Sequence, residues 1–198
     1  MVKKAELNEI DRVIKQIWKN NIRKDYRSDY LLKEDTLKNS FYYHLRRKLG
    51  IRFLESNDIR IFTEFSDGEL KGTGSRADIA VVKMSKTRKE YYLGDNVEAI
   101  IAIIELKFSR GSDGVFYADI GKIRDYIRVQ NINCLYYLGF IAEKVYDNPN
   151  WLDGRQTRNW ADKKVAVLSA NYESNGDGRM VFHIQSCNGL NKDMDSRE

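Results

Sequence analysis

The chain has 198 residues, the length of one typical domain, and a mean hydropathy of −0.59 with 42% hydrophobic residues predicts a soluble chain that can fill a core. Lys and Arg outnumber Asp and Glu by 34 to 29, and the resulting charge of +5 is compatible with a polyanionic partner but ordinary for this length. Because no apolar stretch approaches the roughly 20 residues of a membrane helix, and residues 1–12 lack a signal-peptide core, we expect a cytoplasmic protein without a membrane segment.

Two amphipathic helices are predicted at the start of the chain. In residues 7–19 the apolar side chains recur at the spacing of a helix with one buried face. They are Ile10, Val13, Ile14, Ile17 and Trp18. Residues 31–49 have the same periodicity, and Gly50 follows them as a C-terminal cap. The apolar positions of this second helix are Leu37, Phe41, Leu45 and Leu49.

Strands are predicted in the middle of the chain. Residues 59–65 alternate with a period of two, and residues 76–84 form a second strand after a glycine-containing turn, so these two segments predict an antiparallel hairpin. A polar turn over residues 85–89 leads to a short extension over residues 90–93. Residues 97–108 (VEAIIAIIELKF) are the most apolar segment, which indicates a strand buried on both faces near the centre of a sheet.

The remaining elements complete a mixed α/β sheet. Phe116, Ile120, Ile123 and Ile127 space a helix between the strand at 97–108 and a buried strand at 134–142, which predicts a parallel crossover. Residues 148–164 form a loop with a short helix, and strands at 165–172 and 180–185 follow. We therefore predict an α/β fold with helices on the faces of a mixed sheet, as a single domain over residues 1–187 with a polar tail over 188–198.

Few residues are suited to nucleophilic or soft-metal chemistry. Cys134 and Cys187 each lie in an apolar stretch, which predicts two buried thiols in a reducing compartment. Two histidines, His44 and His183, exclude a histidine-rich metal site and disfavour histidine catalysis. Hydrolytic chemistry would therefore depend on carboxylates, lysine and a hard metal ion.

The candidate catalytic residues are polar side chains that interrupt apolar strands. Glu105 and Lys107 follow Ile100–Ile104 directly, and their i, i+2 spacing places both on one face of the strand. Burying either charge is costly unless it is paired or bound to a metal, so the alternatives are a solvated edge pair or one internal salt bridge. Asp78 interrupts the strand RADIAVV, where the alternative is a turn former at a strand end. If the two strands are neighbours, Asp78 and Glu105 lie together and could share Mg²⁺.

Glu34 is a third candidate. It lies three residues before Leu37 and seven before Phe41, so a helical period of about 3.6 residues places it on the apolar stripe. Asp35 points away from that stripe. Glu34 therefore either reaches a site or marks the solvated first turn of the helix.

The stretches RADIAVV and IIAIIELKF together resemble the active-site signature of the PD-(D/E)XK, or restriction-endonuclease-like, nuclease superfamily. The residues that match are Asp78, Glu105 and Lys107, with Glu34 as the helix acid, while Ala77 stands where many members have proline. The order of elements from about Tyr30 to Ala142 is also similar. The resemblance implies a restriction-endonuclease-like core and an Mg²⁺- or Mn²⁺-dependent endonuclease that hydrolyses phosphodiester bonds in nucleic acid, with DNA favoured over RNA.

The same resemblance implies roles for individual residues. Asp78, Glu105 and the carbonyl of Leu106 would hold the metal, and Lys107 would orient the attacking water. Glu64 matches an acid near the site in many relatives, and Lys122 is a weaker candidate for phosphate contact. Homodimers are common among such nucleases, and a partner protein could supply specificity. Two alternatives remain open, namely a non-catalytic module that binds nucleic acid or a partner, and a structural subunit in which Glu105 and Lys107 form a buried ion pair.

An aromatic and basic cluster occurs later in the chain. Trp151, Arg155, Arg158 and Trp160 would suit stacking on unpaired bases, and they would equally suit packing of a helix against the sheet.

Overall fold

A computed structural model describes residues 2–72, 74–87, 91–130, 132–147 and 149–188. Its centre is a six-stranded sheet whose strands are arranged in sequence order, from β1 at one edge to β6 at the other. The strands are β1 Ile59–Phe65, β2 Ala77–Met84, β3 Val97–Ser109, β4 Leu135–Val145, β5 Val165–Tyr172 and β6 Val181–Ser186. β1, β2 and β3 pair antiparallel, β3, β4 and β5 pair parallel, and β6 returns antiparallel to β5. The predicted mixed α/β sheet is confirmed.

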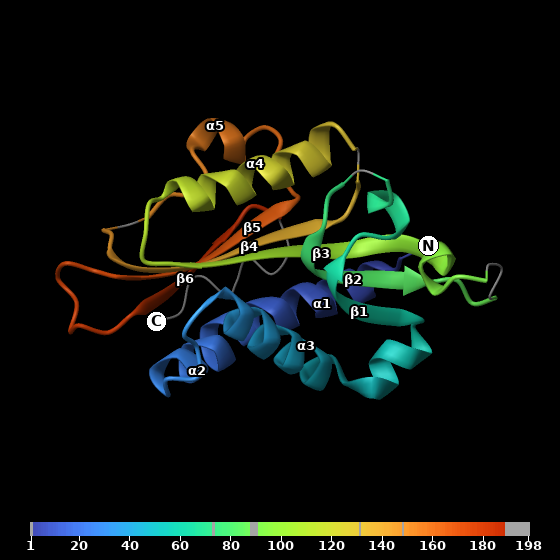
Figure 1. The fold of residues 1–198 in the computed structure, drawn as a ribbon, viewed down its shortest axis with the longest axis horizontal. Coiled ribbons are helices and arrows are strands. Elements are labelled where there is room, and N and C mark those ends of the chain that lie inside the picture. The colour runs from blue at the N-terminus through green and yellow to red at the C-terminus, as the bar shows by residue number, and fades with distance from the viewer. Residues whose placement is uncertain (1, 73, 88–90, 131, 148, 189–198) are drawn as a thin grey trace.

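Helices cover both faces of this sheet (Figure 1). One face carries α1, α2 and α3, and the other carries α4 and α5. Their bounds are α1 Lys4–Gln16, α2 Arg23–Arg27, α3 Glu34–Ser56, α4 Gly114–Arg128 and α5 Gly154–Thr157. A π-helix, η1, runs over Ile17–Ile22, and two short 3₁₀ turns, η2 and η3, occupy Gly68–Leu70 and Leu93–Asn96. None of the helices within the described residues is long and apolar enough to cross a bilayer.

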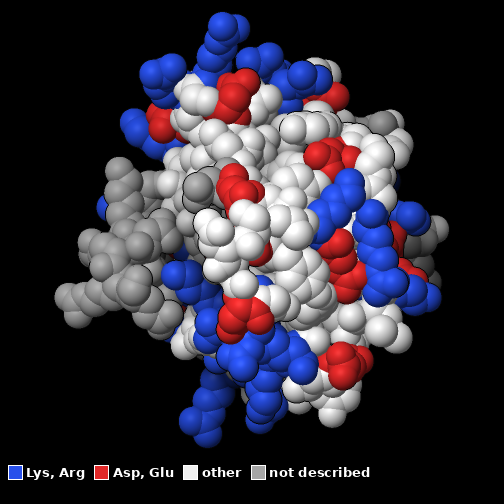
Figure 2. Space-filling view, turned by 90° about the vertical axis from the view of Figure 1, so that its left-hand side faces the viewer, with Lys and Arg blue, Asp and Glu red and all other residues white. Residues whose placement is uncertain are grey.

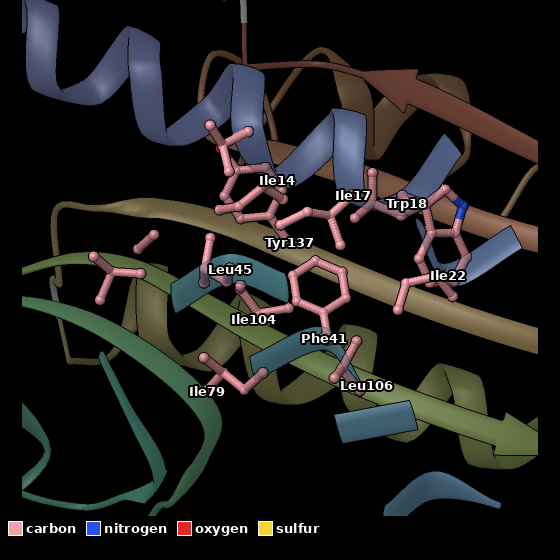
Figure 3. Close-up of a cluster of buried hydrophobic side chains, with 14 of the residues drawn as sticks. Ile14, Ile17, Trp18, Ile22, Phe41, Leu45, Ile79, Ile104, Leu106 and Tyr137 are labelled. Carbon is pink, nitrogen blue, oxygen red and sulfur yellow. The ribbon is translucent and has the colours of Figure 1, made fainter. Parts of the chain in front are cut away.

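Two apolar clusters, one on each face, fix the helices to the sheet. On the first face, side chains of α1, η1 and α3 meet β2, β3 and β4 (Figure 3). Phe41 and Leu45 of α3 lie against Ile79 and Ile104 there, and all four are fully buried. On the second face α4 packs Phe116 and Ile123 onto the sheet. Since β3 is covered on both faces, its continuous apolar run is explained.

The helices on the first face differ from the predicted ones in length. The predicted helix over 7–19 continues through the π-helix, which keeps Ile17, Trp18 and Ile22 all fully buried. The short helix α2 was not expected from the sequence. Gly50 does interrupt the second helix, with φ 72° and ψ 151°, but the chain becomes helical again as far as Ser56. A residue without Cβ adopts this conformation without the usual steric penalty, so the break is local.

Other departures come from tertiary contacts. Leu93, placed in a short strand extension from the sequence, begins a 3₁₀ turn and is exposed, while residues 88–90 lie outside the described part. Trp151 and Trp160 are buried in the second cluster, so the packing alternative for the aromatic cluster is the correct one. Of the two thiols predicted to be buried, Cys134 is buried, whereas Cys187 is only half-buried.

Asn188, predicted as the first residue of a polar tail, is in fact buried. Its amide nitrogen donates to Asp11 Oδ1 at 2.6 Å, and its amide oxygen accepts from Lys15 Nζ at 3.2 Å. Asp11 and Lys15 form a buried ion pair of 3.0 Å. Burying such a pair requires further hydrogen bonds, and Asn188 supplies them, which a hydropathy pattern does not reveal. Residues 189–198 of the predicted tail lie outside the described residues.

Candidate active site

The candidate site forms where β3 continues past the start of β2. The last backbone pair between these strands joins Ile79 to Ile104, and one further step along the register places Asp78 beside Glu105. Beyond that step the backbone N–H of Leu106 donates to Asp78 Oδ2 at 2.8 Å. The Asp78 carboxylate therefore accepts a hydrogen bond from β3 at a position where backbone pairing with β2 has stopped. The two predicted metal ligands, Asp78 and Glu105, lie on the adjacent strands β2 and β3 at the same end of the sheet.

Glu105 is the most deeply buried of the charged side chains at the site, with 1% of its surface exposed. Lys122 Nζ donates to Oε2 at 2.7 Å, while Oε1 is buried and has no hydrogen-bond partner among the described residues. Burial raises the pKa of Glu105 to about 8, Asp78 and Asp119 raise it further, and the charge of Lys122 opposes the rise. At neutral pH this carboxyl is therefore mainly protonated in the absence of another cation.

Lys107 links the two helical layers. Its Nζ lies 2.8 Å from Glu34 Oε2 on α3 and 3.7 Å from Asp119 Oδ2 on α4. Burial by itself lowers the pKa of Lys107, but the hydrogen bond that Lys107 donates to Glu34 and the charges of Asp119 and Asp78 outweigh it, so the pKa is raised. Lys107 is therefore a fixed positive charge two residues from Glu105 along β3.

Glu34 satisfies both interpretations of its position in the sequence. It is the first residue of α3, and its side chain remains 36% exposed, as expected for a helix start. The same side chain reaches Lys107, which places it at the site. The helical-wheel argument therefore identified the correct direction for this carboxylate.

Glu64 occupies the edge strand β1 next to Asp78. Thr63 pairs with Ile79 and Phe65 with Ala77, so Glu64 is the residue opposite Asp78 that the ladder omits. Its φ of 52° is unusual for glutamate and marks a local distortion of the strand. The distortion allows the carboxylate to bind Lys38 of α3 and Arg76, the latter at 2.6 Å. Glu64, expected near the site from the motif resemblance, therefore contacts the edge of the site through Lys38 and Arg76.

Three site residues were weak or absent in the sequence analysis. Lys38 binds Glu64 and lies 3.9 Å from Asp78 Oδ1, and its spacing of four residues from Glu34 was the available signal. Lys122 contacts Glu105 and the carbonyl of Arg76, at 2.7 and 2.6 Å, so it binds the carboxylate directly. Asp119 is one turn before it on α4, and burial raises the pKa of its carboxyl.

A hard divalent ion such as Mg²⁺ binds to oxygen ligands, which the site could supply from its carboxylates and backbone. Within the described residues no three His, Cys, Asp or Glu side chains form a preformed metal centre. The predicted set, however, has only two carboxylates and a backbone carbonyl. In a strand the N–H and C=O of one residue point to the same side, so the Leu106 carbonyl faces the side on which Asp78 lies. With the unpartnered Glu105 Oε1, these oxygens fit an ion such as Mg²⁺.

Charges of both signs are interleaved at this end of the molecule. Figure 2 views the side on which β3 ends and α4 begins, and acidic and basic side chains alternate across part of it. The site holds the carboxylates of Glu34, Glu64, Asp78, Glu105 and Asp119 and the cations of Lys38, Arg76, Lys107 and Lys122. With all five carboxylates ionised the site carries one excess negative charge, which protonation of Glu105 removes and which a bound cation would offset.

Comparison with models of protein families, with curated protein sequences and with solved structures gave no match to this chain. The geometry of the site and the resemblance in the motif are therefore the two indications of its function.

Replacing Glu34 by glutamine tests whether this residue acts at the site. The change keeps the shape of the side chain but removes the negative charge beside Lys107, so phosphodiester cleavage should fall by at least about tenfold with the melting temperature nearly unchanged. Asp35→Asn is the matched control, because that carboxylate is 65% exposed and pairs only with Lys33 at 3.5 Å among the described residues. Equal losses in both variants would indicate a general electrostatic effect and contradict a specific role.

Proposed function

We propose that this protein is a metal-dependent nuclease of the PD-(D/E)XK type, with a restriction-endonuclease-like core, that hydrolyses phosphodiester bonds in nucleic acid, with DNA favoured over RNA. The observation that carries the proposal is the juxtaposition of Asp78 and Glu105 on adjacent strands, with Lys107 two residues further along β3. A sheet interior does not normally retain an unpartnered carboxylate oxygen, and Glu105 Oε1 is one.

The side chains would divide the chemistry among them. Asp78, Glu105 and the Leu106 carbonyl would hold Mg²⁺ or Mn²⁺, which supplies Lewis acidity toward the phosphate and a lower pKa for water. Lys107 would donate a hydrogen bond to the attacking water and offset negative charge that develops on the phosphate. Glu34 and Asp119 hold the Lys107 ammonium in place from the two helical layers.

A second candidate function is binding without cleavage. It is favoured by the hydrogen bonds within the site, because Lys122 donates to Glu105 and Lys107 donates to Glu34. For cleavage, the Lys122–Glu105 hydrogen bond would have to weaken so that Glu105 is available as a ligand.

Incubation with supercoiled plasmid, linear duplex DNA, single-stranded DNA and RNA tests the proposed function directly. Each substrate is treated with EDTA, Mg²⁺ or Mn²⁺, and the products are separated by electrophoresis. Cleavage that requires the metal and is lost in Asp78→Asn supports the nuclease. Retention of nucleic acid without cleavage in any metal supports the binding alternative instead.

Metal binding itself predicts a stability change that does not depend on a substrate. A ligand of the folded state at a hundredfold excess over its Kd adds about 2.7 kcal/mol, or roughly 5–10 °C in melting temperature for a chain of this size. We expect Mg²⁺ or Mn²⁺ to produce such a rise in the wild type and none in Asp78→Asn, measured by differential scanning fluorimetry. Ca²⁺ and added NaCl at matched ionic strength are the controls for nonspecific screening.

A further inference from the structure

A groove away from the candidate active site lies between α3 and the free edge of β1. Two adjoining hollows of about 450 and 300 Å³ form it, and they share Tyr42, Arg46, Ile51 and Leu54 as walls. The arginine–tyrosine groove is defined here by six of its lining residues. They are Tyr42, Tyr43, Arg46, Arg47, Ile51 and Arg60.

The break at Gly50 shapes this groove. The chain leaves helical geometry there with φ 72°, and a Cβ built at Gly50 would meet no atom within 4 Å, so the position is open. The reversal brings Ile51 into the wall of the groove, where 57% of its surface is exposed. Tyr43, two turns before Gly50, is 55% exposed. The side chains of Ile51 and Tyr43 thus expose apolar surface to solvent next to the basic part of α3.

The arginines of the groove are not neutralised by the protein. Within the part of the chain that the structure describes, Arg46, Arg47 and Arg60 form no ion pair, and Glu55 is the one carboxylate among the residues that line the two hollows. Arg47 lies 5.9 Å above the ring of Tyr43 and donates to its hydroxyl at 3.2 Å. Arg46 donates to the Tyr42 hydroxyl at 3.2 Å. Two of these guanidinium groups are therefore held against tyrosines, Arg47 over a ring and Arg46 at a hydroxyl.

One ridge of α3 connects this groove to the active-site cluster. Residues four apart on a helix are neighbours, and Glu34, Lys38, Tyr42 and Arg46 follow that spacing. The first two contact Lys107 and Glu64, whereas the last two line the groove. Twelve residues of helix span about 18 Å, which corresponds to roughly five steps of a nucleic acid strand at 3.4 Å each. In Figure 1, α3 runs beneath the sheet toward the start of β1 along this path.

We propose that the arginine–tyrosine groove binds a single-stranded segment of nucleic acid that extends from the candidate active site along α3. The proposal rests on the proposed function only in taking the ligand to be nucleic acid. Aromatic rings and an apolar side chain provide stacking surfaces for unpaired bases, and unneutralised arginines provide contacts for the phosphates. A duplex has no exposed base faces for the rings, and an acidic peptide would use the arginines but not the rings.

Fluorescence anisotropy with a fluorescein-labelled oligothymidylate of about 15 nucleotides tests the proposal, in EDTA so that no cleavage occurs. Arg46→Gln/Arg47→Gln should weaken binding at least about tenfold and make the slope of log K against log salt shallower by about 1.4, for two lost phosphate contacts. Tyr43→Ala should weaken binding about fivefold or more, while Tyr43→Phe keeps the ring and should bind as the wild type does.

The matched control removes the same charge elsewhere. Lys24 and Arg27 of α2 are exposed and form no ion pair within the described residues, so Lys24→Gln/Arg27→Gln has the same net charge as the groove variant. Equal weakening in the two double variants would overturn the proposal in favour of nonspecific attraction. A matched duplex or a labelled oligoglutamate peptide that binds as tightly as the oligothymidylate, with the same sensitivity to the groove variant, would also overturn it.

Failure of the groove and failure of the nuclease are distinguishable. If no substrate is cleaved but the groove variants lose binding, the nuclease proposal fails and the groove proposal stands. If substrates are cleaved and the groove variants bind and cleave normally, the groove proposal is wrong.

Discussion

Lys107→Ala is expected to reduce phosphodiester cleavage by about a hundredfold or more, since removing one group that stabilises developing charge has effects of this size. Lys107 is the cation on β3 closest in sequence to Glu105, and Glu34 and Asp119 hold it there. Binding of Mg²⁺ should persist, because an ammonium group donates hydrogen bonds and cannot ligate a cation. Cleavage rates with saturating Mg²⁺ and the metal-induced rise in melting temperature, measured on the same preparation, separate the two effects.

Two further variants serve as controls for the Lys107→Ala experiment. Lys33→Ala removes an exposed lysine and should cleave as the wild type does. Lys107→Met keeps the length of the side chain without its charge, and it should be as inactive as Lys107→Ala if the charge matters. Wild-type cleavage by Lys107→Ala would show that water activation depends on another group.

Glu105→Gln is expected to abolish metal-dependent cleavage and to change how stability depends on pH. Burial raises the pKa of this carboxyl to about 8 in the folded protein, against 4.5 when unfolded. Between those values the folded state keeps a proton that the unfolded state has released, so the free energy of unfolding falls as pH rises through this range. The stabilisation from the protonated Glu105 carboxyl is complete below pH 4.5 and lost above about pH 8. Its size is about 1.4 kcal/mol for each unit by which folding raises the pKa.

Glutamine cannot ionise, so the variant should avoid that loss. We expect Glu105→Gln to melt close to the wild type at pH 5 and several degrees above it at pH 9 without metal, in calorimetry or fluorimetry. Glutamine keeps an oxygen that can accept the hydrogen bond of Lys122. Added Mg²⁺ should reduce the difference in melting temperature between Glu105→Gln and the wild type at pH 9, because the ion stabilises only the wild type. A constant difference at all pH values would show that Glu105 is ionised, and the assigned pKa direction would be wrong.

The sequence by itself determined the arrangement of the elements that carry the site. The stretch from Ala99 to Ile104 has no polar residue, which predicts a strand buried on both faces, and it forms the centre of strand β3. The alternation of 59–65, the turn that follows it and the strand at 77–84 fixed the β1–β2 hairpin. Charges at the end of such strands are costly without a partner, which is why Asp78, Glu105 and Lys107 were identifiable as candidates.

Only the tertiary structure decided which groups neutralise these charges. Lys122 and Lys38 look like solvated helix residues in the sequence, because helical periodicity gives a direction but not the neighbour that it meets. Their contacts with Glu105 and Glu64 depend on the packing of α4 and α3 against the sheet. The left-handed conformation of Glu64 coincides with the interruption of the β1–β2 ladder opposite Asp78, whereas local propensity favours an ordinary strand there. Burial of Asn188 likewise follows from the ion pair of Asp11 and Lys15, whose partners are remote in the chain.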